Sequence, residues 1–279
     1  MTNREEQRKG RETAVNAQAA QTAEAAQAAK TIQAAQAALR EKAVAVTGLS
    51  KSYSGKKVIE NLNLTIRTGQ IYGLLGANGA GKSTAVECIL GTRRADSGEV
   101  RILGLDPVTE RRHLFEQVGV QFQEASYPDR IKVRELCEET ACLYEKTADY
   151  RDLLRQFKLE DKADSMLSQL SGGQKQRLFI ILALIPGPRV VFLDELTTGL
   201  DTKSRREVWK CLLEMKDKGL SICLVSHFMD EVEMLCDQIG ILRDGMFVFE
   251  GTVKEAVDIS PYSNLEDAYL WWTQEEENR

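Results

Sequence analysis

The sequence contains no apolar stretch of about 18 residues, the length that a membrane-spanning helix needs. The nearest candidate, residues 178–185, is ended by Pro186 and Pro188. The amino-terminal segment MTNREEQRKGRE mixes charges of both signs and lacks the apolar core of a signal peptide. We therefore expect neither a membrane span nor a secretory leader.

Cysteine spacing and charge exclude further classes of protein. The net charge of -5 disfavours binding of nucleic acid through a basic face. With 43% hydrophobic and 28% charged residues, the 279-residue chain has an ordinary globular composition, and its length suggests roughly two domains. No CxxC pair occurs, which predicts reduced and mostly buried thiols in a reducing compartment. The six cysteines are Cys88, Cys137, Cys142, Cys211, Cys223 and Cys236.

Residues 13–40 have low complexity, because Gln, Glu or Lys recurs at every third position with mostly alanine between. Alanine is the best helix former, so propensity alone predicts a helix. A period of three does not match the turn of a helix, so the polar side chains would spiral around it. Two interpretations stay open: a solvated, fraying or partly disordered extension, and a partner-binding or coiled-coil arm.

Strand and helix patterns alternate after this segment. Residues 70–75, 189–193 and 222–225 are short apolar runs typical of buried strands. Residues 82–90 and about 203–217 have the pattern of helices, and each is followed by a glycine. Strands that alternate with helices predict an α/β fold with a parallel sheet covered on both faces.

A glycine-rich segment between a predicted strand and a predicted helix fits the phosphate-binding pattern G-x-x-x-x-G-K-[ST]. Glycines let the backbone turn tightly, so that N–H groups face phosphate oxygens, and the helix start adds partial positive charge. Lys82 can reach the β and γ phosphates, the Ser83 hydroxyl can bind Mg²⁺, and Thr84 can donate to an inner phosphate. The loop consists of Gly76, Ala77, Asn78, Gly79, Ala80, Gly81, Lys82 and Ser83.

Two acids, Asp194 and Glu195, end the apolar strand 190–193. A carboxylate there can hold the Mg²⁺ that bridges the β and γ phosphates, and Asp194 suits that role best. Glu195 can then orient or deprotonate the attacking water. Taken alone, the pair is equally well explained as a strand end with solvated acids. The phosphate loop favours the catalytic interpretation.

The segment Leu170-Ser171-Gly172-Gly173-Gln174 distinguishes among nucleotidases. It follows the lysine of the phosphate loop by about 90 residues and precedes the two acids. In this position it resembles the signature of ATP-binding cassette (ABC) proteins, and the resemblance covers about residues 43–250. It implies an ABC-type P-loop ATPase with ATP and Mg²⁺ as cofactors, a RecA-like parallel-sheet core, an antiparallel β subdomain and an α-helical subdomain.

The same resemblance assigns roles to residues that are weak signals by themselves. Tyr53 matches the aromatic residue on which adenine stacks, and Gln123 matches the glutamine loop that senses Mg²⁺, water and the membrane partner. Asp201 matches the D-loop, and His227 matches the switch histidine that contacts the γ-phosphate. The implied catalytic residues are Glu195, His227 and Lys82, and the implied metal-binding residues are Ser83, Gln123 and Asp194.

The signature also bears on assembly. Ser171 is a good helix N-cap, and Gly172 and Gly173 expose backbone N–H groups at a helix start, which makes a second anion site. One nucleotide cannot readily use both sites of one chain. The resemblance implies a head-to-tail homodimer or ABC heterodimer, in which the signature of one chain, including Gln174, covers ATP held by the other.

The partners implied by the resemblance are separate transmembrane permease subunits, docked on the helical segment near 125–170, at the cytoplasmic face of the cell membrane. Residues 263–270 are similar to the short carboxyl terminus of the drug, polyketide and polysaccharide export branch, which favours export. We divide the chain into an extension (1–42), an ABC ATPase domain (43–258) and a C-terminal segment (259–279).

One departure from the family and two alternatives remain. Leu196 stands where the family usually has proline, which can loosen the turn leading to Asp201 but removes no chemical group. The alternatives are a soluble ABC ATPase that acts on ribosomes or DNA, and a non-hydrolysing scaffold that binds ATP only to dimerise. One cassette with a transporter-type carboxyl terminus disfavours the first, and the intact Glu195 and His227 disfavour the second. We expect no nucleic-acid partner.

Overall fold

The computed structural model describes residues 41–122 and 127–274. The chain divides into residues 1–41 and a compact unit of residues 42–279, and the described structure lies almost wholly in the second. The low-complexity segment 13–40 lies outside the described residues, and so does Gln123.

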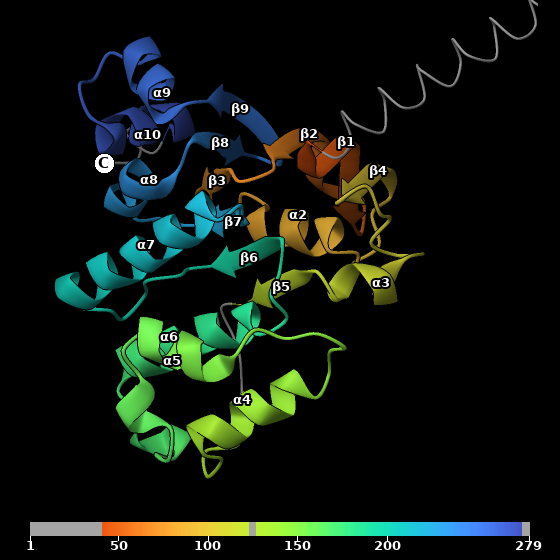
Figure 1. The fold of residues 1–279 in the computed structure, drawn as a ribbon. Coiled ribbons are helices and arrows are strands. Elements are labelled where there is room, and N and C mark those ends of the chain that lie inside the picture. The colour runs from red at the N-terminus through yellow and green to blue at the C-terminus, as the bar shows by residue number, and fades with distance from the viewer. Residues whose placement is uncertain (1–40, 123–126, 275–279) are drawn as a thin grey trace, which may run out of the picture. The chain divides into compact units, whose positions relative to one another are not determined.

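A six-stranded sheet with the order β5-β6-β7-β3-β8-β9 forms the centre of this unit (Figure 1). The first five strands in this order are parallel, and β9 pairs antiparallel with β8. Every residue of β3 and β7 is buried, as expected for parallel strands covered on both faces. The predicted parallel α/β core is therefore confirmed. The strands are β3 (Ile71–Gly76), β5 (Val118–Gln121), β6 (Val190–Asp194), β7 (Ser221–Val225), β8 (Gln238–Arg243) and β9 (Met246–Gly251).

A separate antiparallel sheet has the order β2-β1-β4, with β1 (Lys42–Tyr53), β2 (Lys56–Arg67) and β4 (Ser97–Ile102). Ser54 and Gly55 join β1 to β2 with φ values of 49° and 83°. Positive φ at both central residues is what a two-residue hairpin turn of type I′ requires. The sheet carries Tyr53 at the end of its first strand.

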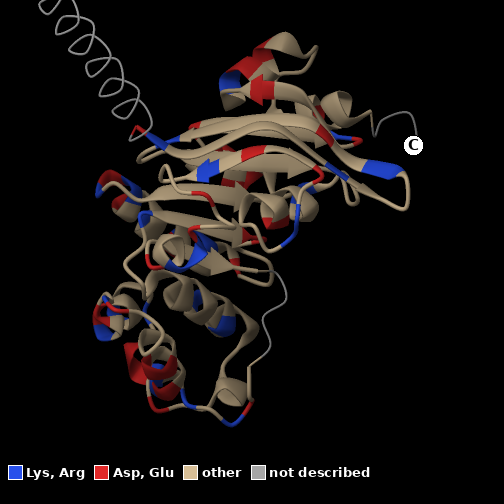
Figure 2. Cartoon of the chain, turned by 90° about the vertical axis from the view of Figure 1, so that its right-hand side faces the viewer, with Lys and Arg blue, Asp and Glu red and all other residues tan. Residues whose placement is uncertain are grey.

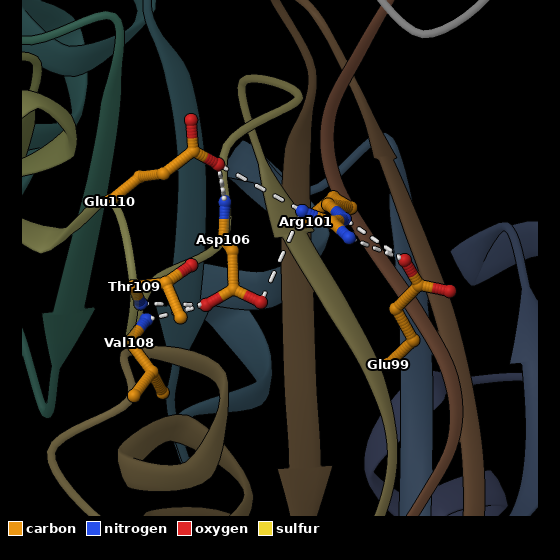
Figure 3. A network of polar contacts seen from close by, with 6 residues as sticks. All are labelled: Glu99, Arg101, Asp106, Val108, Thr109 and Glu110. Carbon is orange, nitrogen blue, oxygen red and sulfur yellow. Dashed lines mark hydrogen bonds and ion pairs between the residues drawn. The ribbon is translucent and has the colours of Figure 1, made fainter.

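A polar network fixes the connection between β4 and α3 (Arg111–Phe115) (Figure 3). The Asp106 carboxylate accepts hydrogen bonds from the backbone N–H groups of Val108 and Thr109 at 2.8 and 2.9 Å. Arg101 reaches Asp106 and Glu110 at 4.0 and 3.9 Å. Because these groups are partly exposed to solvent, we assign them a role in loop shape and only a small contribution to stability.

Helices cover both faces of the central sheet. Buried side chains of α6, α7 and the smaller helices α4 and α5 form one core, and α2 and the antiparallel sheet share a second. A third lies under α9 and α10, and Figure 1 shows α4, α5 and α6 grouped below β5. The helices are α2 (Lys82–Ile89), α3, α4 (Val133–Ala141), α5 (Tyr150–Gln156), α6 (Gly172–Leu184), α7 (Thr202–Asp217), α8 (Met229–Leu235), α9 (Val253–Ile259) and α10 (Leu265–Thr273), with 3-10 turns at Glu160–Lys162 and Leu167–Gln169.

Surface charge and the thiols agree with the sequence. In the view of Figure 2, positive and negative segments are interspersed over the ribbon. None of the helices in the described ranges is long and apolar enough to cross a bilayer. The six cysteines are free thiols, of which three are buried, two are partly buried and Cys142 is exposed.

Candidate functional site

The phosphate loop lies between β3 and α2, as the sequence predicted. Gly76, Gly79 and Gly81 have φ values of 151°, 83° and 106°, which side chains rarely adopt. A Cβ added at Gly81 would lie 2.7 Å from the carbonyl oxygen of Val58. Glycine is therefore required here both by conformation and by close packing against β2.

The start of α2 lies at the end of the phosphate loop. Its N-cap is Gly81, and no side chain caps the helix. The Lys82 ammonium donates to the carbonyl oxygens of Gly76 and Ala77 at 2.7 and 3.0 Å. Asn78 and Ser83 are exposed at the loop. An anion bound here would meet helix N–H groups, the positive end of the helix dipole and an ammonium.

The acids at the end of β6 lie beside the neighbouring strand β7, because Asp194 pairs in register with Val225. The backbone of Glu195 has a φ of 52°, and its N–H donates to the Val225 carbonyl at 2.9 Å. Burial, and then the charge of Glu195, raise the pKa of Asp194 to about 6, while Lys82 lowers it. The acid is thus near the phosphate-loop lysine and poorly solvated.

His227 follows β7 and meets the second acid. Its Nδ1 lies 3.6 Å from Glu195 Oε1, and its side chain is 48% exposed. The hydroxyl of Thr198 donates to the other carboxylate oxygen of Glu195 at 3.4 Å. The ends of β3, β6 and β7 therefore bring Lys82, Asp194, Glu195 and His227 to one edge of the sheet.

The Asp194 site fits a magnesium ion. No group of three or more His, Cys, Asp or Glu residues that could hold a metal occurs in residues 41–122 and 127–274. Mg²⁺ is normally held by one or two carboxylates, waters and substrate phosphates, without a cage of protein ligands. A half-buried carboxylate whose charge is destabilised by its surroundings suits such a cation.

The signature segment forms the start of α6. Ser171 caps this helix by accepting a hydrogen bond from the N–H of Gln174 at 3.3 Å, and the Gln174 side chain accepts from the N–H of Ser171 at 2.9 Å. No atom lies within 4 Å of a Cβ added at Gly172, whereas at Gly173 it would lie 2.9 Å from Leu200. The Gly172 face of the helix start is therefore open.

Asp201 starts α7 and is held as an N-cap. Its carboxylate accepts from the N–H groups of Lys203 and Ser204 at 3.0 Å and from the Ser204 hydroxyl at 2.6 Å. The Ser204 hydroxyl is the largest of the contributions that lower the pKa of Asp201. Leu196 is fully buried, and the N–H of Thr198 donates to the Glu195 carbonyl at 3.3 Å. The turn after the acids is closed without a proline.

Tyr53 is the last residue of β1. Its ring is 37% exposed, with the Arg93 guanidinium and the Lys51 ammonium 5.3 and 5.4 Å from its centroid. Gln123, the remaining predicted residue, lies outside the described residues.

Comparison with known proteins identifies the family. The family model described as ABC transporter matches residues 59–198, half of the chain. This range includes the phosphate loop, the signature and the acidic strand end. The chain belongs to the ABC transporter family.

The similar proteins also point to the ABC transporter family. It is 39% identical over 222 residues to the Nod factor export ATP-binding protein I of Rhizobium meliloti (strain 1021), covering 77% of this chain and 66% of the relative. The chain thus spans about two thirds of the length of the curated relatives that it matches. A solved ATP-binding subunit of an ABC transporter is 26% identical with a TM-score of 0.75, covering 82% and 99% of the two chains.

A second solved structure, cbiO1 from Clostridium perfringens, is described as part of the ABC transporter complex cbiONQ. It is 26% identical with a TM-score of 0.69, covering 78% of this chain and 92% of that one. The predicted identity as an ATP-binding subunit of an ABC transporter is confirmed. The prediction of an ATPase is confirmed at the level of the family.

Sequence reasoning missed one contact of this site. The Gln176 side-chain amide, one turn into α6, donates to the backbone carbonyl of Glu195 at 3.3 Å. The helix that begins at the signature therefore contacts the end of β6 in its own chain. The sequence held a weak signal, because Gln176 follows the signature by two residues, but nothing showed that α6 would pass the end of β6.

Proposed function

We propose that this chain hydrolyses MgATP as the motor subunit of an ABC exporter. The convergence of Lys82, Asp194, Glu195 and His227 at one sheet edge carries this proposal. A phosphate binder alone would need the loop but not an acid and a histidine in contact beside it. The division into residues 1–42, 43–258 and 259–279 is part of the proposal.

ATP would lie along the phosphate loop, with its base on Tyr53 and its phosphates against the loop N–H groups 76–84. The Lys82 ammonium would exchange two loop carbonyls for β- and γ-phosphate oxygens. Ser83 and Asp194 would hold Mg²⁺, and Gln123 is assigned to the same metal. Bound Mg²⁺ offsets the charge of the β and γ phosphates.

Hydrolysis would proceed by in-line attack of water on the γ-phosphate. The Glu195 carboxylate orients this water or takes its proton. His227 contacts the γ-phosphate and, with Lys82, stabilises charge that develops during transfer. The 3.6 Å contact between His227 and Glu195 supports this division of roles, because it places an acceptor and a donor side by side.

Assembly as a head-to-tail dimer would complete the site. The open Gly172 face of the capped α6 start is an anion site that the chain's own phosphate loop does not use. In the proposed dimer, Ser171, Gly172, Gly173 and Gln174 of one chain cover ATP held by the other, in a homodimer or with a second ABC chain. Asp201, at the start of α7, lies close to that seam.

Separate membrane subunits would carry the substrate, with this chain at the cytoplasmic face of the membrane. A cavity of about 400 Å³ between β5 and the helices is lined by exposed Phe122 and Leu143 and supports docking there. The Nod factor export relatives and segment 263–270 support export as the direction of transport. The ribosome- or DNA-directed ATPase and the non-hydrolysing scaffold remain the alternatives.

Phosphate release by the purified full chain tests the proposal. We expect Glu195→Gln to lower kcat by about 100-fold or more while ATP binding persists. Glu233→Gln is the matched control, because Glu233 is exposed on α8. Wild-type turnover no higher than that of Glu195→Gln would refute the proposed ATP hydrolysis. If Glu195→Gln stays monomeric at saturating ATP, both alone and with its permease, the dimer is wrong.

A further inference from the structure

Glu231 on α8 is a fully buried carboxylate that the proposed mechanism does not use. One of its oxygens accepts a hydrogen bond from the Trp209 indole at 3.1 Å. The other accepts from the Ser226 hydroxyl at 2.6 Å. Burying a carboxylate costs free energy even when hydrogen bonds offset part of the cost. If the acid contributed only to stability, an apolar side chain would often serve the fold as well or better.

The Ser226 hydroxyl connects Glu231 to residues 226–228, which carry His227 and form the switch segment. It donates to Glu231 and at the same time accepts from the N–H of Phe228 at 3.1 Å. Ser226 and Phe228 flank His227 on both sides. The carboxylate therefore fixes the backbone from which the His227 ring projects toward Glu195.

A second set of contacts ties the same segment to α7. The Arg205 guanidinium donates to the Asp230 carboxylate at 2.8 Å and lies 4.8 Å from the centre of the Phe228 ring. The Phe228 ring in turn packs against the His227 ring at 4.1 Å. Arg205 and Trp209 lie on α7, the helix that Asp201 caps. This helix therefore joins Asp201 to the switch segment.

The contacts favour a carboxylate at this position, because the Trp209 indole and the Ser226 hydroxyl both donate to it. Burial raises the pKa of Glu231, while the Ser226 hydroxyl, the Trp209 indole and the Thr197 hydroxyl lower it. In a Glu231→Gln protein, the amide oxygen would face the Trp209 indole, because an indole N–H can only donate. The amide nitrogen would then face the Ser226 hydroxyl. That hydroxyl would then accept from the amide, and its own proton would lose the Glu231 oxygen as acceptor, which weakens the anchor of the switch segment.

We propose that Glu231 is a positioning residue that holds His227 in place for the γ-phosphate and links it through α7 to Asp201. This inference rests on the proposed hydrolysis. It concerns a residue that touches neither nucleotide nor metal, so its effect should reach kcat through His227 alone.

A double-mutant cycle tests this role. We expect Glu231→Gln to lower kcat for ATP about 10- to 100-fold, as loss of an outer hydrogen-bond partner commonly does, with KM for ATP changed less than about threefold. In a His227→Ala background, Glu231→Gln should cause little further loss, since the residue it positions is gone. Glu233→Gln, the same chemical change on the exposed face of α8, should leave kcat unchanged.

Two results separate this inference from the proposed function. If wild-type protein hydrolyses ATP but Glu231→Gln has normal kcat, or lowers kcat equally with and without His227, Glu231 is only structural and the inference is wrong. If wild-type protein shows no turnover, the proposed function is wrong and so is the inference about Glu231. If Glu231→Gln does not fold, Ser226→Ala is tested instead, because it removes one hydroxyl from the same chain of contacts. The double-mutant cycle with His227→Ala and the criteria above stay the same.

Discussion

Asp194 is expected to destabilise the protein when nucleotide and metal are absent. Burial and the charge of Glu195 raise its pKa from 3.8 to about 6. Between these two pH values the folded protein binds more protons than the unfolded chain. The free energy of unfolding therefore falls as pH rises from 3.8 to about 6 and stays reduced above that range.

The magnitude follows from the shift. About two pKa units correspond to about 3 kcal/mol, and because Asp194 is only partly buried, screening by solvent reduces this to about 1–2 kcal/mol. Asparagine keeps the shape and removes the charge. Asp194→Asn should therefore raise the free energy of unfolding by about 1–2 kcal/mol near neutral pH, and by progressively less as the pH falls toward 4.

Urea unfolding in a metal chelator, measured at several pH values, checks this. Asp258→Asn is the matched control, because Asp258 is exposed on α9 and should show no gain. Adding MgATP should reverse the order, since only wild-type Asp194 supplies a charge for the cation. An Asp194→Asn protein that is no more stable than wild type near neutral pH would refute the reasoning, as would a gain that does not shrink in acid.

Three further changes probe the fold and the site. Gly119→Ala should lower the free energy of unfolding by about 3 kcal/mol, because the added Cβ would collide with the Ala183 carbonyl of α6; unchanged urea unfolding would contradict this. Ser171→Ala should cost about 1 kcal/mol through the lost N-cap, and equal thermal stability would argue against it. Tyr53→Ala should weaken ATP binding about 5- to 100-fold with kcat at saturation little changed, measured by calorimetry and turnover.

The parallel core was predictable because its signals are local. The strand that ends at Gly76 is buried throughout, and so are the four residues of β6 before Asp194, so each appears as an unbroken apolar run. The structure then shows how the site forms: strands that are distant in sequence are neighbours in the sheet, and β7 lies between β3 and β6. Strand order depends on contacts between distant residues, so the motifs alone could not supply it.

Other elements escaped sequence reasoning for physical reasons. β8 and β9 form the far edge of the sheet, and we did not predict them although Ile239 and Ile241 are buried. The run is short and interrupted by Gly240, whose backbone must approach Tyr72 and Phe247 closely. A glycine that is needed because an aromatic ring packs closely against it cannot be told, from sequence alone, from a glycine in a turn.

Glu231 shows this limit most clearly. It lies in the sequence between Asp230 and Val232, and a second acid follows at Glu233, so the segment resembles the solvated face of a helix. Only the structure separates the exposed Glu233 from the fully buried Glu231, because burial is decided by α7, which supplies Trp209. Burying an acid costs free energy that its donors only partly offset, so its presence here suggests a role beyond stability. We infer that the segment carrying His227 depends on Glu231, so the carboxylate would act on the proposed hydrolysis through that segment without touching the nucleotide.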